Sequence, residues 1–124
     1  HLDLYTHKQL RLMIELHSGL AIGNIELFDF EPLYRRVGIG ILIADTSHRR
    51  KGIASEAMKL LTDYCFKTLG MHQIYCHVPI ENEPSIKLML KHGFEITGTK
   101  KDWIRYQGKW ADVYFLQLFE GIKV

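Results

Sequence analysis

The stretch DTSHRRKGIASE, residues 45–56, determines the fold that the rest of the chain is expected to adopt. The apolar run Ile41–Ala44 precedes it and the amphipathic segment Ile53–Leu69 follows it, which predicts a strand, a loop and a helix. This order directs backbone N–H groups and the positive end of the helix dipole at one point, and Gly52 lets a ligand approach the backbone closely. The stretch therefore predicts a binding site for a phosphate-rich anion.

Three consecutive basic residues add positive charge to this stretch: Arg49, Arg50 and Lys51. The alternative to an anion site is a solvated basic turn, because helix starts normally favour acidic residues over basic ones. The spacing matches neither of the common nucleotide-binding loops, G-x-x-x-x-G-K-[ST] and G-x-G-x-x-G. The sequence has instead Arg49-x-x-Gly52-x-Ala54.

The composition excludes several classes of protein. The chain has 124 residues, so one domain spanning residues 1–124 is expected. A net charge of +2 is too small to make nucleic acid the main partner, and no apolar run approaches the about 20 residues that span a membrane. The 7 histidines show no ligand spacing, so no metal is expected. Cys65 and Cys76 are expected to be buried thiols, which indicates a reducing compartment, the cytoplasm.

Alternating and helical patterns predict an α/β fold with a mixed sheet. Period-two alternation predicts strands at 10–16 and 20–27, joined by a hairpin, with a bulge at Gly23–Asn24 where the phase slips. A strand at 37–44 carries glycines that leave one face bare. The strand at 72–78 follows the expected helix, and this order implies a parallel pair at the centre of the sheet.

The last third of the chain predicts a helix, a short strand and a hairpin. Asn82 is a candidate cap for a helix that Gly93 ends. The short strand spans 94–98, and Gln107–Lys109 is the turn of the final hairpin.

Arg49-x-x-Gly52-x-Ala54 resembles the R/Q-x-x-G-x-G/A loop of the GNAT family of N-acetyltransferases, which grips the pyrophosphate of acetyl-CoA. Asn82-x-x-Ser85 through Gly93-Phe94 is similar to the family's N-x-x-[AS]…G-F helix, whose Asn contacts the pantetheine arm. The order of the expected elements matches the family over about residues 8 to 119. The strand and two helices that the family places first are absent from this sequence, so the acceptor side is expected to be incomplete.

The end of the chain carries a further resemblance. Gly108-Lys109-Trp110-x-Asp112-Val113-Tyr114 is similar to the branch that holds ribosomal-protein N-terminal acetyltransferases and spermidine acetyltransferases. The alternative is an aromatic hairpin that simply packs. The resemblance implies transfer of an acetyl group from acetyl-CoA to a primary amine, which would be a polyamine, a protein N-terminus or another small amine.

The resemblance also implies a set of residues that bind acetyl-CoA. The backbone of one splayed strand would pair with the pantetheine arm, the loop and helix start would hold the pyrophosphate, and the second helix would contact the arm. The matching positions are Ile41, Leu42, Ile43, Arg49, Arg50, Lys51, Gly52, Ile53, Ala54, Ser55, Asn82 and Ser85. Asn82 is also expected to cap its helix, and both roles can hold together.

The catalytic residues depart from the family pattern. Many relatives carry a tyrosine, the acid, seven residues after the motif's Asn, where this chain has Met89, and Gly38, Ile39 and Gly40 occupy the region where a glutamate base is common. The expected substitutes are a base from the second strand, directly or through water, and an acid from three candidates. The bases are Glu26 and Asp29, and the acids are Tyr34, Ser85 and Cys76, although Glu26 as a solvent-facing residue and Cys76 as a core residue are the simpler interpretations.

Two other functions stay open at this point. A CoA-binding module without turnover is suggested by Met89 and by the absent first part, and a nucleotide or nucleic-acid binder is suggested by the basic loop alone. Aromatic residues near the C-terminus also predict a homodimer, because exposed aromatic strands commonly associate. They are Trp103, Trp110, Phe115 and Phe119.

Overall fold

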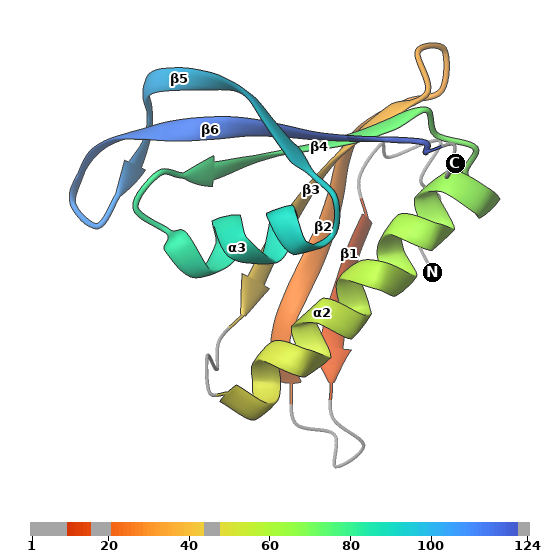
Figure 1. The fold of residues 1–124 in the computed structure, drawn as a ribbon, viewed down its shortest axis with the longest axis horizontal. Helices are drawn as coiled ribbons and strands as arrows, with labels where there is room; N and C mark the ends of the chain where they lie inside the picture. Colours follow the sequence, from red (N-terminus) through yellow and green to blue (C-terminus); the bar gives the residue numbers. More distant parts are fainter. Residues whose placement is uncertain (1–9, 16–20, 44–47, 122–124) are drawn as a thin grey trace.

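The computed structural model describes residues 10–15, 21–43 and 48–121. Within these residues, six strands form one sheet, and two helices and a short π-helical turn connect strands of it (Figure 1). In chain order the elements are β1 (Leu10–Glu15), β2 (Ala21–Glu31), β3 (Arg36–Ile43), α2 (His48–Asp63), the π-helix η1 (Tyr64–Thr68), β4 (Gln73–Pro79), α3 (Glu83–Lys91), β5 (Glu95–Tyr106) and β6 (Lys109–Phe119).

The sheet has the strand order β1-β2-β3-β4-β6-β5. β3 and β4 are parallel, and the other neighbouring pairs are antiparallel, so the predicted mixed sheet with a parallel central pair is confirmed. Short turns join β2 to β3 and β5 to β6, whereas the parallel pair of β3 and β4 requires the crossover that α2 provides.

Both helices cover the same face of the sheet (Figure 1). Side chains from α2, η1 and α3 join one apolar cluster with alternate residues of the strands, as period-two alternation requires. The fully buried members are Leu27, Phe30, Val37, Ile39, Met58, Cys65, Met71, Ile74, Met89 and Leu116. We call this the helix face, and the opposite side of the sheet the second face.

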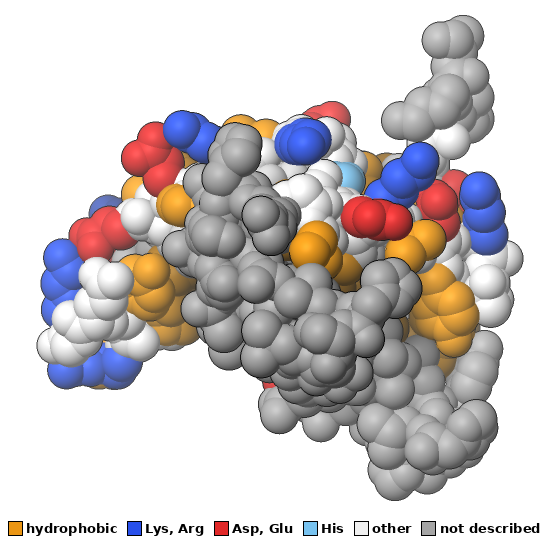
Figure 2. Space-filling view, turned by 90° about the horizontal axis from the view of Figure 1, so that it is seen from below, with side chains coloured by type: hydrophobic (Ala, Val, Ile, Leu, Met, Phe, Trp, Pro, Cys, Tyr) orange, Lys and Arg blue, Asp and Glu red, His pale blue; other side chains and the backbone are white. Residues whose placement is uncertain are grey.

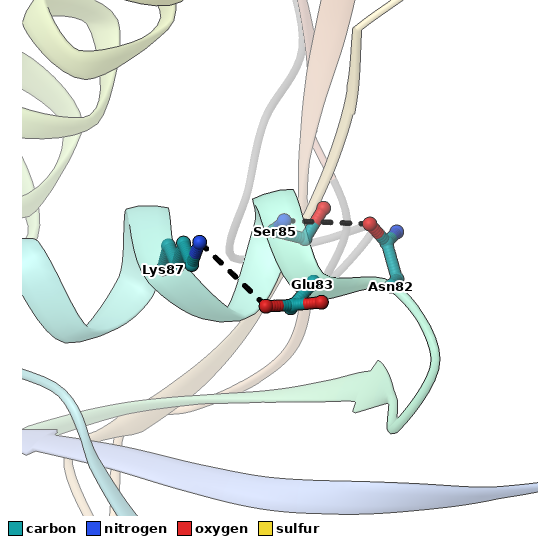
Figure 3. A network of polar contacts seen from close by, with 4 residues as sticks. All are labelled: Asn82, Glu83, Ser85 and Lys87. Carbon is teal, nitrogen blue, oxygen red and sulfur yellow. Dashed lines mark hydrogen bonds and ion pairs between the residues drawn. The ribbon is translucent and has the colours of Figure 1, made fainter.

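Local sequence explains where α3 begins and ends. The Asn82 side chain accepts a hydrogen bond from the backbone N–H of Ser85, as Figure 3 shows, and Pro84 stands in the first turn, where a missing N–H costs nothing. Gly93, with φ +92, ends the helix, and Phe94 then enters the core.

Three features differ from the sequence-based expectation. α2 begins at His48 rather than near Ile53, so the expected loop is shorter and residues 44–47 lie outside the described part. β5 is one strand from Glu95 to Tyr106, because register shifts after Ile96 and after Lys100 absorb the interruption that the sequence suggests. The bulge of the first hairpin falls between the pairs Ile14–Gly23 and Glu15–Ala21, one residue before the predicted place.

The surface in Figure 2 mixes charges of both signs. Lys and Arg side chains alternate with Asp and Glu over the described part of this view, so no extended basic face appears there. Among the described residues, no helix is long and apolar enough to cross a membrane.

Candidate active site

The parallel strands β3 and β4 separate partway along their length. Beyond Gly38 and Tyr75, β3 continues beside β2 as far as Ile43, while β4 continues beside β6 as far as Pro79. Figure 1 shows the two strands pointing in different directions. We call the last pair, Gly38–Tyr75, the divergence point. The pairs before and at this point are Arg36–Gln73, Val37–Ile74 and Gly38–Tyr75.

Each diverging strand leads into the N-terminus of a helix. β3 ends at Ile43 and α2 begins at His48, while β4 ends at Pro79 and α3 begins at Glu83. The N-terminal N–H groups of a helix lack intrahelical partners and carry partial positive charge. The carboxyl end of the parallel pair therefore combines exposed strand edges with two anion-favouring helix starts.

The predicted phosphate-binding residues occupy the first two turns of α2. Arg49, Arg50 and Lys51 lie in the first turn, and Gly52, Ile53, Ala54 and Ser55 continue the helix. Gly52 is exposed, and a Cβ added there would meet nothing within 4 Å, so its bare Cα leaves open space beside the helix start. Because α2 begins early, the unpaired N–H groups belong to its first residues rather than to Gly52–Ser55.

A hydrogen bond joins the two helices close to this place. Ser55 Oγ lies 2.9 Å from His92 Nε2 at the C-terminal cap of α3. Burial and the neighbouring Lys91 lower the pKa of His92, which favours the neutral ring. The sequence motif thus connects to the end of α3 through a side chain that pattern analysis did not single out.

The second face carries aromatic and polar side chains around the divergence point. Phe28 lies over the bare Gly38 and meets Tyr75 edge to face, with ring centroids 6.1 Å apart. The Tyr75 hydroxyl donates to the Asp29 carboxylate over 3.2 Å. Burial, followed by Asp29, raises the pKa of Tyr75 to about 12, so this phenol stays protonated at neutral pH.

His77 follows Tyr75 on the second face. Its ring stacks on that of Trp103, with ring centroids 5.9 Å apart and an interplanar angle of 22°. The centroid of the His77 ring lies 5.1 Å from that of Phe115 and 6.2 Å from that of Tyr75, which it meets edge to face. Burial and then Lys100 lower the pKa of His77, which favours the neutral imidazole. The Lys100 ammonium itself lies 4.4 Å from the centre of the Trp103 ring.

The candidate base Glu26 lies on the second face, and the candidate acids lie apart from it. Glu26 pairs with Gly40 in β3, two residues beyond Gly38 at the divergence point. Tyr34 is 61% exposed in the turn before β3, at the end where β3 and β4 are still paired, and its ring contacts Arg36. Ser85 lies in the first turn of α3, its N–H bound to the cap.

Met89 and Cys76 belong to the core of the helix face. Met89 is 1% exposed, so the position where relatives carry an acid holds a packing residue. Burial raises the pKa of the Cys76 thiol to about 12, which agrees with the expectation of a core residue. Within the described part of the chain, no cluster of His, Cys, Asp and Glu is arranged to hold a metal ion.

The predicted site residues do not include Tyr75, His77 or His92. Alternation with Ile74 and Cys76 already indicated that Tyr75 and His77 share the other face of their strand. It could not show that this face lies beside the divergence point, because the place where two strands separate depends on partners far away in the sequence.

Comparison with known proteins gives one consistent family. The family described as Acetyltransferase (GNAT) domain matches residues 2–95. The chain is 30% identical over 117 residues to spermidine N(1)-acetyltransferase of Vibrio cholerae, covering 92% of this chain and 67% of that protein. It is 28% identical over 110 residues to an L-amino acid N-acetyltransferase of Escherichia coli, covering 86% of this chain and 67% of that protein.

A solved structure supports the same fold. The dodecameric structure of spermidine N-acetyltransferase from Vibrio cholerae superimposes with a TM-score of 0.83 at 26% identity, covering 94% of this chain and 68% of that chain. Across the curated relatives it matches, the chain spans about two thirds of the relative's length or less, with 67%, 42% and 63% for three of them.

Proposed function

The chain belongs to the GNAT acetyltransferase family, and on that basis we propose that it transfers the acetyl group of acetyl-CoA to a primary amine. The observation that carries the proposal is the divergence of β3 and β4, with a helix N-terminus after each strand. Diverging strand edges offer hydrogen bonds to an extended arm, and the helix starts favour a pyrophosphate. Acetyl-CoA contains both groups.

The pyrophosphate is assigned to the first turns of α2, with backbone N–H groups as the main contacts and the basic side chains as secondary ones. The pantetheine arm follows the edge of β3 along Ile41, Leu42 and Ile43, whose amides also polarise the thioester carbonyl. The Asn82 amide and Ser85 meet the arm from the start of α3. The cap uses only the side-chain oxygen of Asn82, which leaves its NH₂ group for the arm.

The acceptor class is a small primary amine, with a polyamine first. Two observations support a cationic acceptor: Glu26 and Asp29 both come from β2 beside the divergence point, and relatives named for spermidine are among the best matches. A protein N-terminus or an amino acid is the alternative, because a relative named for L-amino acids matches nearly as well.

The reaction requires a neutral amine, a polarised carbonyl and a proton for the leaving thiolate. Glu26 is proposed as a base, acting directly or through water, and Tyr34 or Ser85 as an acid. The buried Met89 favours a second candidate function, a CoA-binding module with little turnover, since no phenol stands at its position. A screen of spermidine, peptides and amino acids with acetyl-CoA, reading free thiol release, separates the two: binding without thiol release supports the module.

The binding site is tested by comparing Gly52→Val with Arg50→Ala. We expect Gly52→Val to weaken CoA binding by about tenfold or more, since a side chain there holds the pyrophosphate away from the helix start, and a loss of about 1.4 kcal/mol corresponds to tenfold. Arg50→Ala is expected to have the smaller effect. Isothermal titration calorimetry with CoA measures both.

The control for this comparison is the stability of the Gly52→Val variant. A Cβ at Gly52 meets no protein atom within 4 Å, so the free energy of unfolding of Gly52→Val should stay close to that of the wild type. Equal CoA affinity for the wild type and Gly52→Val would contradict the assignment.

We further propose one domain that forms a homodimer and resides in the cytoplasm. Trp103, Trp110 and Phe119 are 53%, 59% and 42% exposed, which supports an association surface. The free, buried thiols of Cys65 and Cys76 are consistent with a reducing compartment. A monomer by light scattering at micromolar concentration would reject the dimer.

A further inference from the structure

His77 has a buried ring nitrogen to which no described residue is hydrogen-bonded. Its Nε2 is buried and forms no hydrogen bond with the described residues. Leaving a buried polar atom unpaired destabilises the folded state, so such an atom calls for a functional explanation. A phenylalanine would fill the same aromatic surroundings without this cost.

The sheet register places His77 directly beyond the divergence point. If β3 and β4 continued to pair in the register of Gly38–Tyr75, His77 would stand opposite Gly40. Gly40 has no side chain and pairs on its other side with Glu26. Of the β4 side chains on the second face, His77 is therefore the first one past the place where the strands part, and the β3 residue at the matching position, Gly40, carries no side chain.

Three aromatic rings hold the imidazole in place. Trp103 covers one ring face from β5, Phe115 lies beside it on β6, and Tyr75 meets it edge to face from its own strand. Contacts with three rings fix the orientation of the imidazole. Trp103 is 53% exposed, so the stack that covers the imidazole lies at the surface of the described part of the chain.

The charges around His77 keep it neutral. Lys100 on β5 is the cation that acts on it, and with burial it lowers the pKa of the imidazole. On β4, Tyr75 has a pKa of about 12 and is neutral, and its hydroxyl is bound to Asp29 of β2. A neutral imidazole with an unpaired ring nitrogen is able to accept a proton near pH 7.

We propose that His77, in place of Glu26, is the general base that takes the amine proton in the acetyl transfer, a role that rests on the proposed function. The amine nitrogen bonds to the acetyl carbon as the carbon–sulfur bond breaks, the amine proton passes to His77 Nε2, and the thiolate leaves with the electron pair of the broken carbon–sulfur bond. The imidazolium then returns the proton to the thiolate or to water. Nε2 accepts only in the tautomer that carries its proton on Nδ1.

The first experiment compares His77→Gln with His72→Gln in the intact chain. With spermidine and acetyl-CoA, His77→Gln should lower kcat/KM by about a hundredfold or more, the usual worth of a general base, while CoA affinity by calorimetry stays unchanged. His72 is the matched control, because it also contacts an aromatic ring, Phe119 at 5.8 Å, but precedes β4 at the paired end of the sheet. Free imidazole should partly restore the rate of His77→Ala.

The second experiment uses the pH profile and needs no change at His77. Lys100→Met removes the cation that lowers the pKa of the imidazole, so the acid limb of kcat/KM should move to higher pH. A merely structural histidine would leave that limb in place. The role of His77 as the base is contradicted if the acid limb of kcat/KM stays in place in Lys100→Met. It is also contradicted if His77→Gln has a kcat/KM within about threefold of the wild type. Absence of thiol release by the wild type overturns the proposed function as well, which separates the two failures.

Discussion

At the scale of single residues, Gly38 is the position where one added methyl group should matter most. A Cβ there would overlap the ring of Phe28, in a contact closer than real Cβ atoms essentially ever make. Phe28 cannot simply rotate away without losing its edge-to-face contact with Tyr75. We therefore expect Gly38→Ala to lower the free energy of unfolding by about 1–3 kcal/mol, the usual cost of overpacking.

Gly40 is the matched control for this substitution. It lies on the same strand and face, but its added Cβ would approach Phe28 only to 3.8 Å, an ordinary contact. Urea unfolding of both variants should show a large loss for Gly38→Ala and a small change for Gly40→Ala. Equal losses would mean that strand propensity, and not the contact with Phe28, governs these sites. Phe28→Leu combined with Gly38→Ala should recover part of the loss.

Single residues also show where sequence analysis reached its limit. The glycines of β3 were predicted to leave one face bare, and the contact of Phe28 with Gly38 gives a reason for the first of them. Met89 shows the opposite case. The family motif marks its position as the one where relatives carry an acid, but its burial depends on how α3 turns toward the sheet, and α3 presents Ile86 and Met89 to the core.

At the scale of elements, the start of α3 allows two roles of Asn82 to be measured separately. Asn82→Ala should destabilise the protein by about 1 kcal/mol, because it removes the side-chain oxygen that accepts from Ser85 N–H (Figure 3). Asn82→Asp keeps an accepting oxygen and an acid at a helix N-terminus, so its stability should stay near that of the wild type. Asp has no NH₂ group, so CoA affinity should fall.

The comparison of these two variants requires denaturant unfolding and calorimetry with CoA. If Asn82→Ala is less stable and Asn82→Asp keeps full CoA affinity, then Asn82 only caps the helix and does not contact the pantetheine arm. Asn82→Ser, which caps but lacks the amide, is the check that a negative charge is not responsible for weaker binding.

Elements were predicted well where local chemistry determines them. Asn82 caps the start of α3 and Gly93 ends it, as predicted. In the hairpin turn, φ is 51 at Gln107 and 81 at Gly108, as a tight hairpin requires. The prediction was wrong where distant pairing decides. The sequence predicts a short strand that ends at residue 98, but pairing with β6 continues and resumes after the bulge between Lys100 and Ile104. The Asp112 carboxylate stabilises this bulge by accepting a hydrogen bond from Asp102 N–H at 2.9 Å.

At the scale of the whole molecule, stability should fall at alkaline pH. Burial raises the pKa values of Cys65 and Cys76 from 9.0 to about 12, and burial with Asp29 raises that of Tyr75 to about 12. Between pH 9 and pH 12 the unfolded chain ionises these thiols while the folded chain does not. Their contribution to stability is thus complete below pH 9 and is lost as pH rises toward 12.

Unfolding by urea at several alkaline pH values measures this effect. Between pH 9 and pH 12, each buried thiol should lower the free energy of unfolding by up to about 1.4 kcal/mol per pH unit. Cys76→Val, which has a similar volume and no thiol, should show a shallower decline than the wild type. An identical decline in both proteins would mean that Cys76 does not cause it.

The separation of β3 and β4 has a mechanical consequence for the molecule. The strands β1, β2 and β3 form one half-sheet, and β4, β6 and β5 form another, and the hydrogen-bonded seam between them is only three residue pairs long. Without a ligand, the seam and the shared core beneath the helices keep the halves in register. An extended ligand that forms hydrogen bonds with the separated edges of β3 and β4 would lengthen this seam. Acetyl-CoA would then hold the two half-sheets together as well as react. Its departure after each turnover would return the two halves to their looser coupling.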